Sequence, residues 1–260
     1  MTGEAATGRV VWTVNGEDRF KFLQGLISND VLPLQKAPGI FWAALLTPQG
    51  KYLADFFVIR PEGRDELLID IAEPLAADTF RRLTMYRLRA AVQITPTDIA
   101  VSRGLGAAPA GTFADPRSPA LGWRGYGRKE LDGEPMVDWD DLRVTHTIPE
   151  SGIELIPNET YLLEAGFERL HGVDFRKGCY VGQEVTARMK HKTELRKGLV
   201  TLGIEGSAPI GTAILTADGK EAGRLYTQAN GKALAHMRFD RMDGDLLADH
   251  ARLIRLPDAK

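Results

Sequence analysis

The chain has 260 residues and a mass of 28.6 kDa, enough for one large domain or a few small ones. It is 43% hydrophobic and 26% charged, as ordinary globular proteins are, and its net charge of −2 excludes an overall electrostatic preference for nucleic acid or membranes. No apolar run approaches the roughly 20 residues that cross a bilayer, and the start MTGEAATGRV has the pattern of neither a signal peptide nor a transit peptide. Because a single cysteine cannot form an internal disulfide, we expect a reducing compartment, the bacterial cytoplasm.

The first half of the chain predicts helices that alternate with strands. Residues 9–14 (RVVWTV) are typical of a strand, and Asp18 is a candidate N-cap for a helix in EDRFKFLQGLISNDV. Residues 41–72 contain three strand-like runs separated by TPQG and PEG turns, which indicates a meander. A second helix is predicted over 73–89, and the strand AAVQI follows it. Helices that alternate with strand pairs favour an α+β fold over a parallel sheet.

The sequence pattern of the second half differs from that of the first and changes again near residue 198. Residues 102–135 are rich in Gly, Pro, Ala and Arg and predict a long surface excursion. A helix is predicted over 158–170, with Asn158 as its cap. From residue 198 onward, short strands separated by Gly, Asp-Gly and Asn-Gly turns are typical of a small antiparallel barrel. We therefore predict two units, residues 1–197 and 198–260.

The stretch KGCYVGQE, residues 177–184, holds the only cysteine, Cys179. A thiol acts as a nucleophile or a metal ligand only as the thiolate, and neighbouring cations favour that form. Residues 176–197 contain seven Lys or Arg and two Glu. Gly178 and Gly182 allow the backbone to turn tightly and to approach a ligand closely. The stretch therefore suits a thiolate held beside an anion site.

Other interpretations of this stretch stay open. Most lone cysteines are small buried hydrophobes, and a basic run is most often a solvated face. A closed zinc site or a stable iron–sulfur cluster normally requires four ligands. Because this chain has one cysteine, a cluster would need a partner, a second copy of the chain or transient handling. A Cys–His hydrolase needs a base beside the thiol, and neither a nucleophile-elbow nor a papain-like pattern is present.

KGCYVGQE with its continuation VTARMKHKTELRKGL resembles the signature of the YgfZ-type folate-binding proteins. These are relatives of the glycine-cleavage T-protein (aminomethyltransferase) and include mitochondrial iron–sulfur assembly homologues. FLQGLISNDV, GKYLAD, DPRSPALGW and IPE also match, so the resemblance covers nearly the whole chain. It implies a T-protein-like three-lobed ring, with two interleaved α/β lobes, a C-terminal antiparallel β-barrel and tetrahydrofolate in the central opening.

The resemblance also implies roles for particular residues. Cys179 and Gln183 stand where the T-protein usually has aspartate and lysine, which marks the YgfZ branch. Cys179 would be the working thiol and Lys177 its electrostatic activator. Asp55 matches the carboxylate next to the folate nitrogens, although it is equally well interpreted as a strand-end aspartate that caps a turn. The residues assigned to the folate are Asp55, Tyr180, Gln183, Glu184 and Arg188.

One position departs from the T-protein pattern. Thr145 stands where the T-protein has a glutamate that helps to hold the pterin ring. Either another carboxylate substitutes, with Glu150, Glu154 and Glu184 as candidates, or folate binds more weakly here.

The leading hypothesis is a folate-binding accessory protein for the assembly or repair of iron–sulfur proteins, not a turnover enzyme. Its partners would be iron–sulfur proteins or assembly factors, and cluster-dependent tRNA methylthiolation would depend on it. The alternatives are an aminomethyltransferase-like, tetrahydrofolate-dependent enzyme and a tRNA-binding module that uses the basic stretch. The basic stretch has no interleaved aromatic residues, which weakens the case for direct RNA binding.

Overall fold

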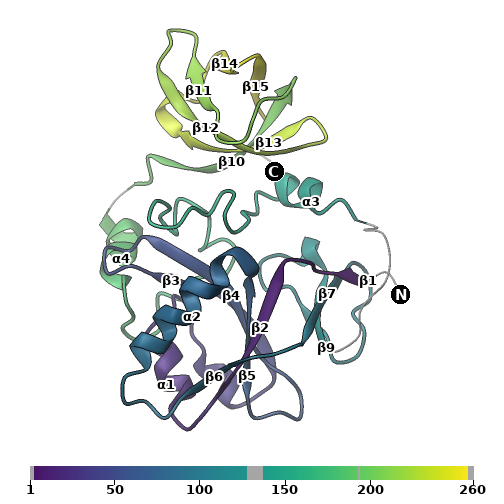
Figure 1. Ribbon diagram of the computed structural model, residues 1–260. Coiled ribbons are helices and arrows are strands. Elements are labelled where there is room, and N and C mark those ends of the chain that lie inside the picture. The colour runs from purple at the N-terminus through teal and green to yellow at the C-terminus, as the bar shows by residue number, and fades with distance from the viewer. Residues whose placement is uncertain (1–2, 128–136, 193, 257–260) are drawn as a thin grey trace.

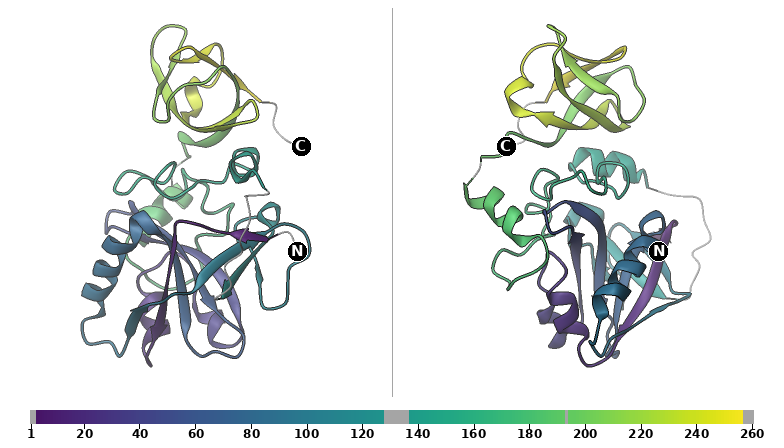
Figure 2. Two further views of the ribbon diagram at one scale, coloured as in Figure 1. Left: turned by 45° about the vertical axis from the view of Figure 1, so that its right-hand side comes forward. Right: turned by 60° about the vertical axis from the view of Figure 1, so that its left-hand side comes forward.

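The computed structural model describes residues 3–127, 137–192 and 194–256 (Figure 1). Two antiparallel sheets form the body of the molecule, and a closed six-stranded barrel lies at one end of it. Figure 2 shows from two further directions that a segment of turns and short helices lies between body and barrel. The expected α+β class with a C-terminal antiparallel barrel is confirmed. No helix within the described ranges is long and apolar enough to cross a membrane.

The larger sheet of the body contains the predicted meander. Its five strands run in the order β3 (Gly39–Leu46), β4 (Tyr52–Arg60), β5 (Leu67–Ala72), β2 (Arg9–Asn15) and β6 (Gln93–Pro96). Nearly every residue of β3, β4 and β5 is buried, because both faces of this sheet are covered. Helix α2 (Glu73–Arg87) covers one face, where Phe80 meets Trp12 edge-to-face with 5.3 Å between ring centroids.

The smaller sheet corrects one prediction. Residues 128–135 of the segment 102–135 lie outside the described residues, and its described part is not only a surface excursion, because most of this sheet lies within it or beside it. The strand order is β1 (Gly3–Ala5), β7 (Ala100–Gly104), β9 (Trp123–Gly127) and β8 (Phe113–Ala114). Period-two alternation is hard to see in strands this short and rich in Gly and Arg, which explains the error. Since β1 from the chain start pairs with β7, the two lobes are interleaved.

The segment between body and barrel corrects a second prediction. Helix α3 (Trp139–Thr145) begins at Asp138, whose side chain accepts a hydrogen bond from the Asp141 amide. The helix expected over 158–170 is absent, and the backbone there forms consecutive hydrogen-bonded turns. Gly166 has φ +78°, and Asn158, the expected cap, has φ +66°. Both values lie in the left-handed region, so a continuous right-handed helix cannot pass through these residues.

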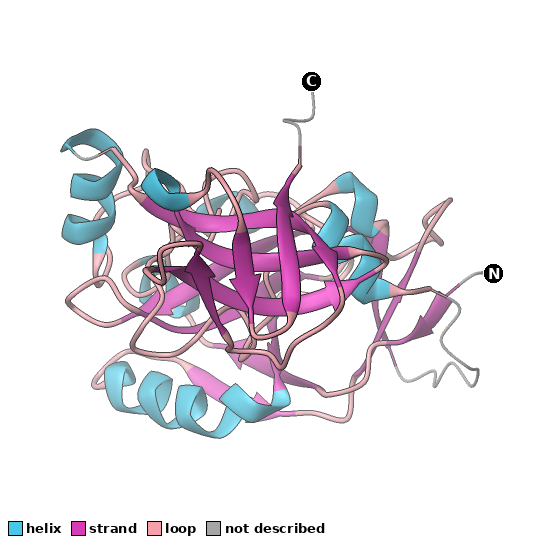
Figure 3. Ribbon diagram, turned by 90° about the horizontal axis from the view of Figure 1, so that it is seen from above, coloured by secondary structure: helices cyan, strands magenta, loops and turns pink. Residues whose placement is uncertain are grey.

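The barrel is built entirely from antiparallel pairs. Its strands close in the order β10 (Lys197–Glu205), β13 (Lys232–Arg238), β12 (Glu221–Ala229), β11 (Ala213–Thr216), β14 (Leu246–Ala248) and β15 (Ala251–Arg255). Figure 3 views the molecule from this end. Alternate residues of the strands fill the interior, where Leu202, Leu225 and Met237 are fully buried.

Candidate functional site

The loop that carries Cys179 is fixed to the end of helix α1 (Arg19–Gln24) and the residues after it. The side chain of Asn29 donates to the His171 carbonyl at 2.7 Å, and the Ser28 hydroxyl donates to the Gly172 carbonyl at 2.6 Å. Further along, the amide of Val181 donates to the Gly25 carbonyl at 3.2 Å. Cys179 lies between these anchors and is exposed. The fold therefore presents this thiol to solvent on a fixed loop, not inside a hydrophobic core.

Lys177 provides the central anchor of the loop. Its ammonium group donates to three backbone carbonyls at the end of α1, those of Gln24 (2.8 Å), Ile27 (2.5 Å) and Asn29 (3.0 Å). The residue is 7% exposed. Burial lowers the pKa of Lys177 from 10.5 to about 8, although Asp30 and Asp174 act in the opposite direction. This geometry is that of a positioning residue for the loop, and the predicted role as activator of Cys179 stays a prediction.

The two glycines of the motif differ in their surroundings. Gly182 has φ +84°, and a Cβ atom there would lie 2.6 Å from the Thr47 carbonyl oxygen. Apart from its two chain neighbours, no described residue has a heavy atom within 4 Å of the position that a Cβ on Gly178 would occupy. Gly182 is thus required by the turn that starts helix α4 (Gln183–Lys192), whereas Gly178 leaves open space beside Cys179.

The residues assigned to folate do not form one site. Tyr180 is buried, its ring lies 4.7 Å from the Lys177 ammonium, and burial raises the pKa of Tyr180 to about 12. Glu184 and Arg188 form an exposed i,i+4 ion pair of 2.7 Å on α4, and Gln183 is the first residue of that helix. Of the five residues assigned to folate, Glu184 and Arg188 therefore bind each other at the surface, and Tyr180 is packed inside.

Asp55 lies in the middle of β4 and is 4% exposed, so the alternative interpretation as a turn cap is wrong. Its Oδ1 accepts hydrogen bonds from the Tyr52 hydroxyl (2.6 Å) and the Ser151 hydroxyl (2.6 Å). Its Oδ2 accepts one from the indole N–H of Trp42 (2.8 Å), and the Trp42 ring stacks on Phe167 with 4.0 Å between centroids. The carboxylate thus accepts three hydrogen bonds from side chains of the chain itself.

The carboxylates considered as substitutes at position 145 are also engaged or distant from it. Glu154 is buried, contacts Arg143 at 3.2 Å and accepts a hydrogen bond from the Thr227 hydroxyl at 2.6 Å. Glu150 lies 3.6 Å from Arg143. Thr145 itself accepts a hydrogen bond from Lys232 of the barrel at 3.1 Å.

A small cavity lies beside Arg143 and Glu150. Beyond Trp42, whose ring centroid is 5.9 Å from the Arg117 guanidinium, an enclosed cavity has a volume of about 10 Å³. About one water molecule occupies such a volume. Its lining residues are Arg103, Asp115, Arg117, Leu121, Arg124, Trp139, Arg143 and Glu150. None of the five residues assigned to folate lines this cavity, and Thr145 lines a different one of about 530 Å³, so the folate assignment stays a prediction.

Metal ligands are not clustered either. Within the described ranges there is no group of three or more His, Cys, Asp or Glu side chains that could hold a metal ion. Sequence reasoning missed the residues that hold the thiol loop, Ser28, Asn29 and Gly172. Ser28 and Asn29 lie inside FLQGLISNDV, a string that matched the T-protein relatives, so this match was the signal that could have identified them.

Known proteins resemble this chain in sequence and in fold. The family described as "CAF17, C-terminal beta-barrel domain" matches residues 196–258. The mitochondrial "iron-sulfur cluster assembly factor IBA57" of Homo sapiens is 30% identical over 278 residues, which cover 92% of this chain and 78% of the human protein. The mitochondrial IBA57 homologue of Mycosarcoma maydis is 34% identical over 234 residues, or 77% of this chain and 57% of the fungal protein. The chain thus spans little more than half of some relatives.

A solved structure shows the same fold. The glycine cleavage system aminomethyltransferase T of Bartonella henselae aligns with a TM-score of 0.76 and 14% identity, covering 98% of this chain and 84% of that one. The expected aminomethyltransferase-like architecture is confirmed, as fold alone. The expected cytoplasmic location is wrong by comparison with the relatives, which are named mitochondrial.

Proposed function

Because the chain belongs to the family of the iron–sulfur cluster assembly factor IBA57, we propose that it is an accessory protein that presents the thiol of Cys179 to partners in the assembly or repair of iron–sulfur proteins. The observation that carries this proposal is the exposure of Cys179 on a loop fixed by buried hydrogen bonds. A thiol that only packed a core would be sealed from solvent.

A partner is required by the chemistry of the cluster. Iron–sulfur clusters are held by about four cysteine thiolates, and this chain contains one cysteine. Cys179 therefore supplies at most one ligand, and iron–sulfur proteins or assembly factors supply the others. The open space at Gly178 allows such a partner to approach the thiol closely.

The finer assignments of the resemblance stay separate proposals. They place the chain in the YgfZ branch, with tetrahydrofolate as ligand and tRNA methylthiolation as a dependent process. The packing around Asp55 argues against the folate part, because all three of its hydrogen-bond donors come from the chain itself. Titration with tetrahydrofolate tests it: saturable binding that Asp55→Asn abolishes would restore the folate site.

An aminomethyltransferase-like enzyme is the weaker alternative. The likeness to the Bartonella henselae protein shows a shared fold, and it assigns no role to any residue of the site. Cys179 and Gln183 replace the residues usual in the T-protein, and Asp55 already accepts hydrogen bonds from Trp42, Tyr52 and Ser151. Turnover with a lipoyl-protein and ammonia release would be required to support it.

The test of the proposed function is complementation in a host that lacks its own copy of this gene. We expect Cys179→Ser to fold normally, since an exposed side chain is replaced, and to leave the host's iron–sulfur enzymes with reduced activity. Met85→Ala is a matched control, because it also removes an exposed sulfur atom, at the end of α2. Full enzyme activity with Cys179→Ser would exclude the thiol from the function.

A further inference from the structure

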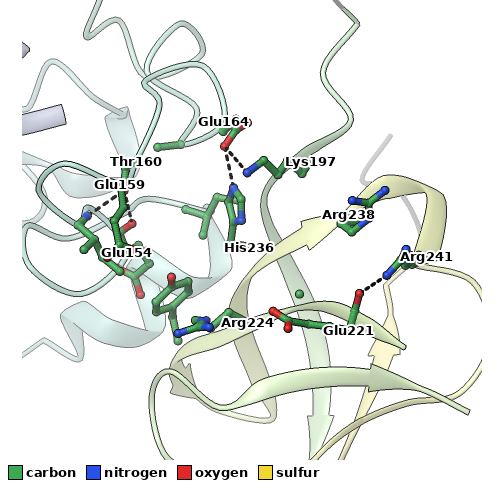
Figure 4. A pocket seen from close by; sticks show the side chains of 15 residues that line it. Glu154, Glu159, Thr160, Glu164, Lys197, Glu221, Arg224, His236, Arg238 and Arg241 are labelled. Atoms are coloured by element: carbon green, nitrogen blue, oxygen red, sulfur yellow. Dashed lines mark hydrogen bonds and ion pairs between the residues drawn. The ribbon is translucent and has the colours of Figure 1, made fainter. Parts of the chain in front are cut away.

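A cavity of about 710 Å³ lies between the outer face of the barrel and the turn segment 154–165 (Figure 4). This volume is in the range of roughly 300–1,000 Å³ that is common for small-molecule sites. Neither Cys179 nor Asp55 lines it. Its charged lining residues come from both walls and comprise Glu154, Glu159, Glu164, Lys197, Glu221, Arg224, His236, Arg238 and Arg241.

Strand register gathers the cations on one outer face of the barrel. Lys197 of β10 pairs directly with Arg238 of β13, and Arg224 of β12 pairs directly with His236 of β13. Residues 236 and 238 point to the same side because side chains alternate along a strand. Like charges directly opposite each other on a sheet are destabilising unless an anion lies between them. The sheet therefore has a cationic face that favours a bound carboxylate.

Neighbouring groups compensate only part of this charge. Glu164 lies 3.2 Å from His236 and 3.5 Å from Lys197, and Asp240 lies 3.0 Å from Arg238. Arg224 is exposed and has no hydrogen-bond or ion-pair partner among the residues that the structure describes. Its planar guanidinium can bind a carboxylate through two parallel hydrogen bonds.

The cavity is also lined by negatively charged side chains that have no ion-pair partner within the described residues. The carboxylates of Glu159, on the turn segment, and Glu221, at the start of β12, have no ion-pair partner within the described part of the chain. In Figure 4, Glu159 lies across the cavity from the barrel, and Arg224 lies near Glu221 on the barrel strand. Between them, Ile156, Leu199 and Tyr226 supply apolar surface.

We propose that this cavity binds a short acidic peptide. The carboxylates of the peptide contact Arg224 and Arg238, its amino group contacts Glu159 or Glu221, and an apolar side chain lies on Leu199 and Tyr226. A ligand that carries both charges complements the lining, because its carboxylates can pair with the arginines and its amino group with a glutamate.

The experiment is a calorimetric titration of the full chain with the dipeptide Asp-Phe and with N-acetyl-Asp-Phe. The acetylated probe keeps both carboxylates and the ring but lacks the ammonium group. We expect Asp-Phe to bind wild type, Arg224→Gln to weaken it about tenfold, and N-acetylation to weaken it by a similar factor. Glu159→Gln is expected to weaken Asp-Phe but not the acetylated probe.

The control is Arg252→Gln, which removes one exposed arginine from β15, a residue that does not line this cavity. We expect it to leave the affinity for Asp-Phe unchanged. The proposal is overturned if Asp-Phe does not bind wild type, if Arg252→Gln weakens binding as much as Arg224→Gln does, or if the acetylated probe binds as tightly as the free dipeptide. The experiment does not involve Cys179, so its outcome is independent of the proposed assembly function.

Discussion

The carboxylate of Asp55 and the hydroxyl of Ser151 are 96 positions apart in the sequence and 2.6 Å apart in space. The hydrogen bond joins the centre of β4 to the segment that follows α3, and therefore joins the larger sheet to the connection toward the barrel. Tyr52 and Trp42 complete the set of donors around the same carboxylate. Asp55, which was expected to bind a ligand, thus connects the larger sheet to the segment after α3.

We predict that Asp55→Ala destabilises the protein. The substitution leaves the buried donors of Trp42 and Tyr52 and the half-buried donor of Ser151 without this acceptor. Each unsatisfied buried group costs about 1–3 kcal/mol, so we expect the free energy of unfolding to fall by about 3 kcal/mol. Urea denaturation measures this loss. Ser151→Ala removes one donor and is expected to cost about 1 kcal/mol. Equal stability of Asp55→Ala and wild type would contradict a structural role for Asp55.

Lys177 gives the stability of the protein a pH dependence in the alkaline range. Its pKa is about 8 in the folded protein and 10.5 as an ordinary lysine, so between these values the unfolded chain binds more protons than the folded one. The free energy of unfolding should therefore rise with pH in this window, by up to about 3 kcal/mol. Lys177→Met lacks the titrating group and should lose this rise relative to wild type. Denaturation of both proteins at several pH values between 7.5 and 10.5 checks it, and parallel curves would refute it.

A buried ion pair between the two sheets gives the third prediction. Arg124 of β9 donates to Asp70 of β5 at 2.7 Å, and both side chains are buried. Burial alone would raise the pKa of Asp70, but the guanidinium groups of Arg9 and Arg124 lower this pKa from 3.8. Asp70 therefore contributes stability above pH 3.8 that is lost as the pH falls through its lower folded value.

Removal of one partner of this pair should be costly. We expect Arg124→Met to lower the free energy of unfolding at pH 7 by about 3–5 kcal/mol, because an incompletely compensated carboxylate stays buried. Arg255→Met, which removes an exposed arginine that pairs with Asp243, is the control and is expected to cost less than about 1 kcal/mol. If both variants lost a similar free energy of unfolding, the buried pair would contribute no more to stability than an exposed pair.

The sequence predicted the parts of the fold that local pattern determines. The meander over 41–72, the helix over 73–89 and the barrel strands have long, regular apolar periodicity, and the structure has them as β3, β4, β5, α2 and the closed barrel. The helix over 158–170 failed because apolar spacing there satisfied a helical pattern while Gly166 adopts a left-handed conformation. The spacing of apolar residues shows which positions can share one face of a helix, but it does not show the backbone conformation of each residue. One glycine with a positive φ is enough to end the helix that the spacing predicts.

The sequence identified the loop that carries Cys179 but not the contacts that hold this loop. KGCYVGQE drew attention to Cys179 while a buried thiol also stayed open, and the structure shows that the thiol is exposed. That Lys177 binds the carbonyls of Gln24, Ile27 and Asn29 follows from contacts about 150 positions apart, which no local pattern encodes. The charged cavity beside the barrel was missed for the same reason, because strand register places Lys197 beside Arg238 and Arg224 beside His236.

The glycines on either side of Cys179 separate the folding role of the loop from its role toward partners. Gly182→Ala places a Cβ 2.6 Å from the Thr47 carbonyl oxygen at a positive φ, so we expect a loss of about 2 kcal/mol or more in the free energy of unfolding. Gly178→Val adds bulk where no described residue apart from the two chain neighbours has a heavy atom within 4 Å, so its stability should stay within about 0.5 kcal/mol of wild type. If a partner approaches Cys179 closely, Gly178→Val must nevertheless impair complementation, because the added side chain occupies the space the partner needs. A Gly178→Val variant that is both stable and fully active would mean that the thiol acts without a closely docked partner.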